Sequence, residues 1–253
     1  MAERVLFGWH AIEALLERHP ERVMRLQCQQ GRDDRRWKQV RALAQQFGIA
    51  METCYRHTLD ELTDGENHQG IVARVKPGPN VTEADLLERI ESAIEPPFLL
   101  VLDGVTDPHN LGACLRTADA AGVSALVVPR DHSAPLNGVA IKVASGGAES
   151  VPVVRVTNLA RFMRQCRELG VWFTGTAEDA KVSIHEVDLR GPLCVVMGAE
   201  GAGMRRLTRE HCDHLATLPM GGLVSSLNVS VATGICLFEA RRQRLIASGD
   251  FGT

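Results

Sequence analysis

The sequence lacks an apolar run long enough to cross a membrane. A membrane-spanning helix needs about 20 consecutive apolar residues, and no segment of the 253 residues approaches that length. The first residues, MAERVLFGWHAIEALLERHP, carry acidic groups and have no small-residue cleavage site, so they do not resemble a signal peptide. We therefore expect a cytoplasmic protein without a membrane partner.

Paired cysteines are also missing. The seven cysteines are an odd set without a CxxC spacing, which argues against a disulfide framework and a zinc cluster. We expect buried free thiols. The alternative is a metal site at His211-Cys212-Asp213-His214, but these ligands are crowded on one segment without a distant partner motif. We predict that no metal is bound.

The chain has no excess of positive charge. Its formal net charge is −3 at pH 7, residues 1–75 carry as many acidic as basic groups, and residues 76–97 carry 5 acidic and 2 basic groups. The charge balance argues weakly against RNA as a partner, so an RNA function has to depend on local patches or motifs. The length allows one large domain or two modest ones.

Residues 1–75 have the pattern of a small α/β domain. Ile12, Leu15 and Leu16 predict a helix within 8–18, and a second helix is expected over 33–47. Strands are expected over 23–28 and 71–75. This alternation predicts a layered α/β domain.

A basic patch that begins just before the second of these helices is the local candidate for contact with RNA phosphates. It comprises Arg32, Arg35, Arg36, Lys38 and Arg41. Two aspartates interrupt the patch, so a solvated helix face is an equally good interpretation.

Residues 76–97 are predicted to be a linker. A turn-rich stretch at 76–80 is followed by a short helix with Thr82 at its N-cap, and two prolines at 96–97 close the segment. The second domain is expected over 98–246, and residues 247–253 are assigned as a tail.

Residues 98–246 alternate short apolar strands with amphipathic helices. The strands are predicted over 98–102, 125–129, 151–154, 171–174, 193–197 and 216–218, and the helices over 111–121, 139–144, 159–169 and 227–244. This rhythm predicts an α/β domain with a mostly parallel sheet covered on both faces. Ligands of such sheets bind beyond the carboxyl ends of the strands, here loops 103–110, 175–178, 198–204 and 219–226.

Three segments at these loops carry polar residues suited to chemistry. In 102–122, Asn110 lies near the expected helix N-cap and Arg116 follows about two turns later; capping and surface exposure are the simpler interpretations. In 195–204, Glu200 lies inside a G-x-x-G-x-G loop, or is an exposed loop acid. That spacing differs from the G-x-G-x-x-G of dinucleotide-binding proteins, which argues against a nicotinamide-dependent oxidoreductase.

The third segment, 218–235, is a loop that enters a helix rich in small residues. Either Ser226 or Asn228 could cap this helix. Small residues at 230, 232 and 234 predict tight packing, within the fold or across a dimer.

Together the three segments resemble the three motifs of the SpoU (SPOUT) methyltransferases, over residues 98–245. The resemblance comprises the Asn…Arg pair, Gly-x-Glu-Gly, and Ser-Leu-Asn-Val-Ser. Within this family the whole chain, including HQGIVARV at 68–75 and SSLN at 225–228, resembles the bacterial enzymes that methylate a guanosine ribose in the peptidyl-transferase loop of 23S rRNA.

The resemblance implies a catalytic domain with a deep trefoil knot, a homodimer, S-adenosylmethionine as cofactor and 23S rRNA as partner. It places the cofactor beside Gly198, Leu218 and Leu227, with Thr176 and Met220 as additions, and the reacting centre at Asn110, Arg116, Glu200, Ser226 and Asn228. The N-terminal domain resembles an RNA-binding module found in ribosomal proteins.

The resemblance also assigns Arg116 to activation of the ribose 2′-hydroxyl. A guanidinium has a pKa above about 12, so it is better suited to binding a phosphate and stabilising a developing alkoxide. We expect Asn110 and Glu200 to orient it. The alternatives are the same reaction on transfer RNA, and an RNA-binding assembly factor without activity.

Overall fold

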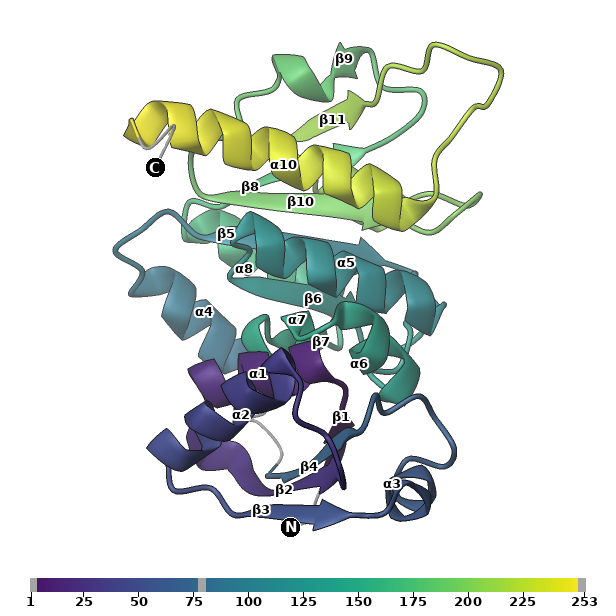
Figure 1. Cartoon of the computed structure of the whole chain (residues 1–253). Helices are drawn as coiled ribbons and strands as arrows, with labels where there is room; N and C mark the ends of the chain where they lie inside the picture. The colour runs from purple at the N-terminus through teal and green to yellow at the C-terminus, as the bar shows by residue number, and fades with distance from the viewer. Residues whose placement is uncertain (1–3, 77–80, 250–253) are drawn as a thin grey trace. The chain divides into compact units, whose positions relative to one another are not determined.

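The computed structural model describes residues 4–76 and 81–249, and the chain forms two compact units, Met1–Pro79 and Asn80–Thr253 (Figure 1). The boundary falls within the turn-rich stretch 76–80. Each unit has its own sheet.

The first unit is a four-stranded sheet with helices. Its elements are β1 (Arg4–Phe7), α1 (Trp9–Arg18), the 3-10 helix η1 (Pro20–Arg22), β2 (Val23–Gln29), α2 (Arg35–Gln46), β3 (Met51–Cys54), α3 (Arg56–Leu62) and β4 (Ile71–Val75). The strand order is β1-β4-β2-β3; β4 is antiparallel to β1 and β2, and β2 is parallel to β3. The ends of β1, β2 and β3 and the start of β4 therefore lie at one edge.

The predicted apolar stripes form the core of this unit. Ile12, Leu15 and Leu16 are fully buried on α1. Helix α2 begins later than predicted because Asp34 is its N-cap and accepts a hydrogen bond from the Trp37 backbone N–H. The layered α/β domain predicted for this part of the chain is confirmed.

The second unit is larger. Its elements are α4 (Glu83–Glu91), β5 (Phe98–Asp103), α5 (Pro108–Ala121), β6 (Ala125–Pro129), α6 (Gly138–Ala144), α7 (Gly147–Ser150), β7 (Val153–Val156), α8 (Leu159–Glu168), β8 (Trp172–Thr176), β9 (Val182–Ser183), η2 (Ile184–Glu186), β10 (Leu193–Gly198), α9 (Arg206–Glu210), β11 (His214–Thr217) and α10 (Val229–Ser248).

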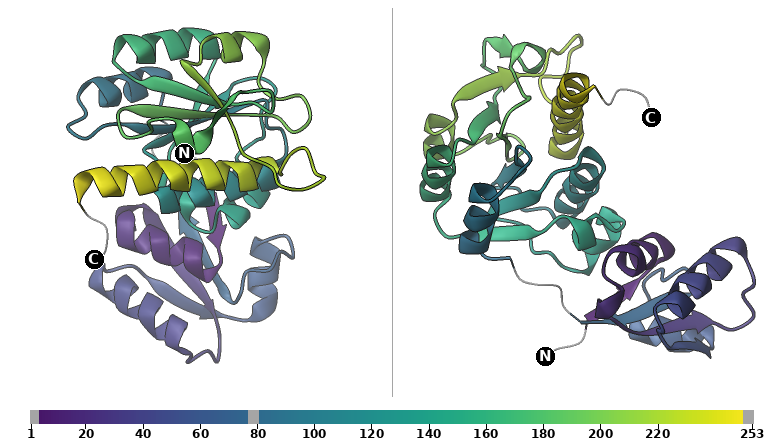
Figure 2. Two further views of the ribbon diagram at one scale, coloured as in Figure 1. Left: turned by 90° about the horizontal axis from the view of Figure 1, so that it is seen from above. Right: turned by 90° about the vertical axis from the view of Figure 1, so that its left-hand side faces the viewer.

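Its seven-stranded sheet has the order β7-β6-β5-β10-β8-β11-β9, with every pair of neighbours parallel. Alternate residues of β5 and β10 point to opposite faces. Leu100 packs with the face covered by α5 and α10, and Val101 with the face covered by α4 and α8. Figure 2 shows these helix pairs on either side of the sheet. The predicted parallel sheet covered on both faces is confirmed.

The segment expected as a linker is largely part of this second unit. Thr82 and Asp85 form a capping box at the start of α4, and the predicted N-cap is confirmed. Leu86 and Ile90 are buried in the same core as α8, and Glu83 pairs with Arg161 at 2.9 Å. Residues 81–97 are therefore not a free linker, because the apolar face of α4 is buried against the sheet domain. Residues 77–80 lie outside the described residues.

Two helix boundaries differ from the prediction for a local reason. Helix α5 begins at Pro108, and Asp107 is its N-cap, accepting from the His109 backbone N–H at 3.0 Å. Proline suits this first helical position because it has no N–H to satisfy. Asn110 is therefore inside the first turn, and its predicted place at the N-cap was wrong.

Near the C-terminus, helix α10 extends to Ser248 and therefore passes the predicted start of the tail at residue 247. Residues 250–253 lie outside the described residues. Among the helices of the described ranges, none has both the length and the apolar character needed to cross a bilayer.

The seven cysteines are free; five are buried, as predicted, whereas Cys54 and Cys212 are only partly buried. Burial raises the pKa of Cys166, Cys212 and Cys236 to about 12, so these thiols stay protonated at neutral pH. The residues of the 211–214 cluster have separate partners: His211 Nδ1 contacts the Leu207 carbonyl at 2.8 Å, and Asp213 pairs with Arg167. Within the described part of the chain, no group of three such ligands could hold a metal ion.

Candidate active site

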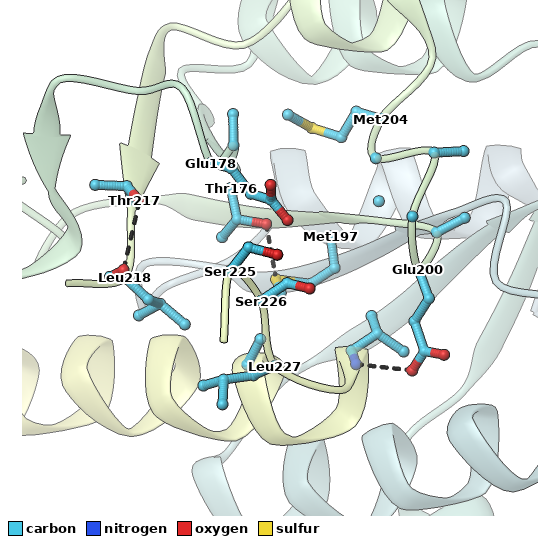
Figure 3. Close-up of a pocket in the computed structure, with 18 of the residues that line it drawn as sticks. Thr176, Glu178, Met197, Glu200, Met204, Thr217, Leu218, Ser225, Ser226 and Leu227 are labelled. Carbon is cyan, nitrogen blue, oxygen red and sulfur yellow. Dashed lines mark hydrogen bonds between the residues drawn. The ribbon is translucent and has the colours of Figure 1, made fainter. Parts of the chain in front are cut away.

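The loops at the carboxyl edge of the large sheet surround a cavity of about 660 Å³. The chain continues from β8, β10 and β11 into this cavity, and the start of α10 closes one side. Figure 3 shows Thr176, Leu218, Ser226 and Glu200, from four separate segments, gathered around it. A parallel sheet brings them together because the strands end at the same edge.

The backbone of the glycine loop at the end of β10 leaves no room for a side chain at Gly198. A Cβ on Gly198 would lie 2.2 Å from the Gly203 carbonyl carbon and 2.3 Å from the Met204 nitrogen. Gly201 and Gly203 have left-handed φ values of 74° and 68°. Two backbone hydrogen bonds between Ala199 and Gly203, at 3.1 and 2.8 Å, close the loop on itself. The glycine spacing found in the sequence is thus a requirement of this fold of the loop.

An ion pair between a buried carboxylate and a half-exposed arginine fixes the far end of this loop. Asp103, at the end of β5, is fully buried, and it accepts hydrogen bonds from the Arg205 backbone N–H at 2.9 Å and from Arg205 Nε at 2.7 Å. Charge-assisted bonds of this kind are stronger than neutral ones. This pair was not predicted from the sequence; the available signal is a carboxylate that ends an otherwise apolar strand.

Three of the predicted residues meet at the cavity edge through their side chains. Asn228 Nδ2 donates to Glu200 Oε1 at 2.5 Å and to Asn110 Oδ1 at 3.0 Å, and Asn110 Nδ2 donates to Glu200 Oε1 at 3.3 Å. Asn110 and Asn228 are far apart in the sequence. The carboxylate of Glu200 is therefore held by amide donors from α5 and from the loop before α10.

Glu200 also lies at the amino end of α10. Its Oε1 atom accepts from the Val229 backbone N–H at 3.1 Å, drawn as a dashed line in Figure 3. A carboxylate is stabilised at a helix N-terminus by the free N–H groups and the helix dipole. Asn228 is the N-cap of α10, since its side chain accepts from the Ser230 N–H at 2.9 Å. Of the two capping alternatives, Asn228 is correct.

The five predicted cofactor residues, Gly198, Leu218, Leu227, Thr176 and Met220, all line the cavity. The exposed side chain of Ser226 lines it too. The prediction did not include Asp179 and Arg209, which form a bidentate ion pair at 2.9 and 2.8 Å on the wall. Hydrogen bonds from Arg209 lower the pKa of Asp179 below its usual value.

Arg116 does not lie in this cluster. It is exposed on α5 and is not among the residues that line the cavity. Within the described part of the chain, its side chain makes no hydrogen bond or ion pair with Asn110 or Glu200. These two side chains bond to each other and to Asn228 instead. The expectation that they orient Arg116 was therefore wrong within a single chain.

The basic residues of the first unit differ in their surroundings. Arg35 and Arg36 are exposed in the first turn of α2, and their side chains form no ion pair with the described residues. Arg32 is engaged: its Nε donates to Asp34 at 2.8 Å, and its guanidinium lies 5.1 Å from the centre of the Trp9 ring.

The second unit has an all-parallel sheet with a polar cluster and a glycine loop at its carboxyl edge. This combination is typical of α/β enzymes that bind a small ligand. Residues 97–238 match the SpoU rRNA Methylase family, and residues 5–81 match a family described as RNA 2'-O ribose methyltransferase substrate binding. The chain belongs to the SpoU rRNA methylase family.

Relatives of known function and solved structures agree with this membership. The 23S rRNA (guanosine-2'-O-)-methyltransferase RlmB of Escherichia coli is 58% identical over 240 residues, which cover 95% of this chain and 98% of that protein. The RlmB protein of Yersinia pestis is 57% identical over 95% of this chain and 97% of its own length.

Among solved structures, the SpoU methyltransferase AviRb from Streptomyces viridochromogenes in complex with the cofactor AdoMet has a TM-score of 0.77. It is 26% identical and covers 96% of this chain and 91% of that one. An rRNA methyltransferase from Sinorhizobium meliloti has a TM-score of 0.72 at 28% identity, covering 95% and 87%.

Proposed function

We propose that the protein transfers a methyl group from S-adenosylmethionine to the ribose 2′-hydroxyl of a guanosine in the peptidyl-transferase loop of 23S rRNA. The observation that carries this proposal is the meeting of Asn110, Glu200 and Asn228 beside the cavity. The 58% identity to an RlmB protein over nearly the whole chain supports the same reaction and substrate.

The cavity suits S-adenosylmethionine in size and chemistry. Its volume of about 660 Å³ is within the usual range for ligand pockets. Leu218 and Leu227 provide apolar walls for an adenine ring, and the glycine loop, whose backbone folds back over Gly198, forms another part of the lining. When bound, the cofactor supplies a methyl group on a positively charged sulfur, which a nucleophilic oxygen can attack directly.

The polar cluster then serves to position the reacting groups. Glu200 is fixed by donors from Asn110, Asn228 and the α10 backbone, so its carboxylate does not have to be ordered when RNA binds. Its second oxygen, Oε2, remains to accept a hydrogen bond. Ser226, exposed on the cavity wall, is placed to hold the ribose. Correct placement of a hydroxyl lowers the barrier of a direct displacement.

Arg116 is proposed to bind a phosphate next to the target ribose and to stabilise the developing alkoxide. Its exposure on α5 supports contact with an RNA chain. A planar guanidinium binds phosphate through two parallel hydrogen bonds, which an ammonium cannot reproduce. Arg116→Lys should therefore reduce turnover strongly, and near-normal turnover of this variant would exclude the bidentate role.

A homodimer is proposed on the basis of α10. Val231, Ile235 and Phe238 are exposed on this helix at positions i, i+4 and i+7, so they share one face. A second copy covering this face would remove apolar surface from water. Light scattering coupled to size exclusion should give a dimer mass, and Phe238→Glu should give a monomer. A wild-type monomer at micromolar concentration would contradict this proposal.

A trefoil knot is proposed for the second unit. Strand β10 lies between β5 and β8, and the chain returns from β11 to pack α10 against α5 and β10. A backbone trace from an experimental structure tests the knot. An unknotted trace between β8 and α10 would exclude it.

The first unit is proposed to bind RNA, with Arg35 and Arg36 contacting phosphates and Arg32 shaping the loop beside them. Their exposure at the start of α2 supports this. Arg35→Glu with Arg36→Glu should weaken RNA binding and make it less dependent on salt, because each lost phosphate contact lowers the salt slope. Ribosomal RNA as substrate supports a cytoplasmic site of action.

The test of the reaction is methyl transfer from labelled S-adenosylmethionine to a 23S rRNA fragment that contains the peptidyl-transferase loop. Label on one guanosine ribose, lost in Arg116→Ala, is the expected result. Label on transfer RNA instead would keep the chemistry and change the substrate. Cofactor binding without label on any RNA would favour an inactive assembly factor.

A further inference from the structure

The loops at one edge of the four-stranded sheet enclose a second cavity of about 630 Å³. Every connection at that edge contributes to its lining: Trp9 follows β1, Gln29 ends β2, Arg56 follows β3, and Gln69 precedes β4. The lining is mainly polar, so the cavity is suited to a charged or hydrogen-bonding ligand rather than to a lipid or an apolar side chain.

The segment before β4 is held in a strained conformation at this cavity. Gln69 has a φ of 56°, which residues other than glycine adopt at a cost, and Gly70 has a φ of 83°. The Trp9 backbone N–H donates to Gln69 Oε1 at 3.3 Å, and the Trp9 indole N–H donates to the Gln69 carbonyl at 3.0 Å. Strain that is held in place by several contacts is typical of ligand-binding segments.

His68 holds this segment in place through both of its ring nitrogens. It is buried, and its Nδ1 accepts a hydrogen bond from the Gly70 backbone N–H at 2.9 Å. Nδ1 therefore carries no proton, and Nε2 donates to Asp60 Oδ1 at 3.0 Å. The arginine side chains on the cavity wall carry its positive charge, opposite the carboxylates of Asp60 and Glu66.

Two of the three arginines on the wall are able to bind an anion. Arg32 is engaged by Asp34 and stacks on Trp9. Arg36 has no ion pair with the described residues, and the ion pair of Arg56, to Asp60, is long at 3.9 Å. Two guanidiniums on one polar cavity match the oxygens of a phosphate group.

An aromatic pair flanks one of these arginines. The rings of Tyr55 and His57 are stacked, with centroids 5.7 Å apart and planes 15° apart, and Arg56 lies between them in the sequence. Tyr55 is the only tyrosine of the chain, and 65% of it is exposed. Exposed aromatic rings beside arginines bind unpaired bases by stacking.

We propose that this cavity and its rim bind one unpaired nucleotide of the RNA substrate. Arg36 and Arg56 bind its phosphate, and its base stacks on Tyr55. The nucleotide has to be unpaired, because bases inside an RNA helix are already stacked. RNA as the substrate class rests on the proposed function; the subsite itself rests on the first unit alone.

The first experiment measures the affinity of the full chain for the 23S rRNA fragment by filter binding over a range of salt. The variant Arg36→Gln/Arg56→Gln should bind about tenfold or more weakly, with a log–log salt slope smaller by about 0.7, because the two arginines share one single-strand phosphate contact. The control Arg18→Gln/Arg25→Gln removes the same charge from residues outside the cavity lining. Equal effects of the two double variants would overturn the proposal.

The stacking contact is tested with a matched pair at Tyr55. Tyr55→Ala should weaken RNA binding about tenfold, whereas Tyr55→Phe, which keeps the ring, should bind like the wild type. In methyl transfer, Tyr55→Ala should raise KM and leave kcat unchanged, because the cavity lies outside the catalytic unit. Equal affinity of the alanine and phenylalanine variants would exclude stacking.

The two proposals fail in different ways. A wild-type chain that binds RNA through Arg36, Arg56 and Tyr55 but transfers no methyl group would retain the subsite and contradict the reaction. A chain that methylates the fragment equally well with and without these side chains would contradict the subsite and retain the reaction.

Discussion

A methyl group added at Gly198 provides a sharp test of how the cavity at the carboxyl edge of the large sheet is built. In Gly198→Ala, the new Cβ would lie 2.2 Å from the Gly203 carbonyl carbon and 2.3 Å from the Met204 nitrogen. Both atoms belong to the backbone, so no rotation of a side chain can relieve the overlap. The glycine loop has to move away from β10.

The cost follows from the contacts that this movement breaks. The two backbone hydrogen bonds between Ala199 and Gly203 contribute about 1 kcal/mol each. Overpacking a tight site costs about 1–3 kcal/mol more. We therefore expect about 3–5 kcal/mol, divided between the stability of the second unit and its affinity for S-adenosylmethionine.

Two measurements detect this cost. If it falls wholly on stability, the lower bound of about 3 kcal/mol lowers Tm by about 6–12 °C. If it falls wholly on affinity, the Kd from isothermal titration calorimetry rises about 100-fold or more. Gly221→Ala is the matched control, since a Cβ there meets no atom within 4 Å. A Gly198→Ala variant with the Tm and Kd of this control would show that the loop accepts a Cβ at position 198 without cost.

Three further perturbations test other parts of the second unit. Glu200→Gln removes the negative charge of the group that accepts hydrogen bonds from Asn228 and from the α10 backbone. We expect the rate of methyl transfer to fall about tenfold or more, while the affinity for the cofactor is retained. An unchanged turnover rate would contradict this. Arg205→Ala leaves the buried Asp103 carboxylate without its charged partner and should lower the free energy of unfolding by about 3 kcal/mol, measured by urea denaturation; an unchanged midpoint would show that the pair is dispensable. Hydrogen bonds from Arg242, and then from Gln243 and His185, lower the pKa of Glu239 from 4.5 to about 2, so its stabilising effect is present above pH 4.5 and is lost as the pH falls toward 2. Glu239→Gln should therefore lose stability less steeply than the wild type between pH 4.5 and 2, and identical acid profiles would exclude this role.

Local patterns were sufficient for much of the fold. The alternation of apolar strands and amphipathic helices predicts the parallel sheet and its two covered faces, because each strand buries side chains on both sides. The predicted helix start was wrong where two nearby residues were both suitable as the N-cap. Asn110 and Asp107 are both good N-caps, and the proline at 108 decides for Asp107 because it fits the first helical position.

The place of α4 shows a different limit. Thr82 predicts the start of this helix, but the acidic and proline-rich surroundings suggested a linker. Only the packed structure shows Leu86 and Ile90 buried in the sheet domain. An amphipathic helix has an apolar face in either case, and its sequence does not say which surface covers that face.

Sequence patterns alone singled out the polar residues Asn110, Glu200 and Asn228, which meet beside the cavity, and the glycines that let the loop close. The tertiary structure decided how they meet. The insertion of β10 between β5 and β8 brings Asn110 and Glu200 within hydrogen-bonding distance and clamps the glycine loop to Asp103, while it leaves Arg116 outside the cluster. Buried parallel strands have similar apolar patterns, so their order depends on contacts between distant segments that periodicity does not encode.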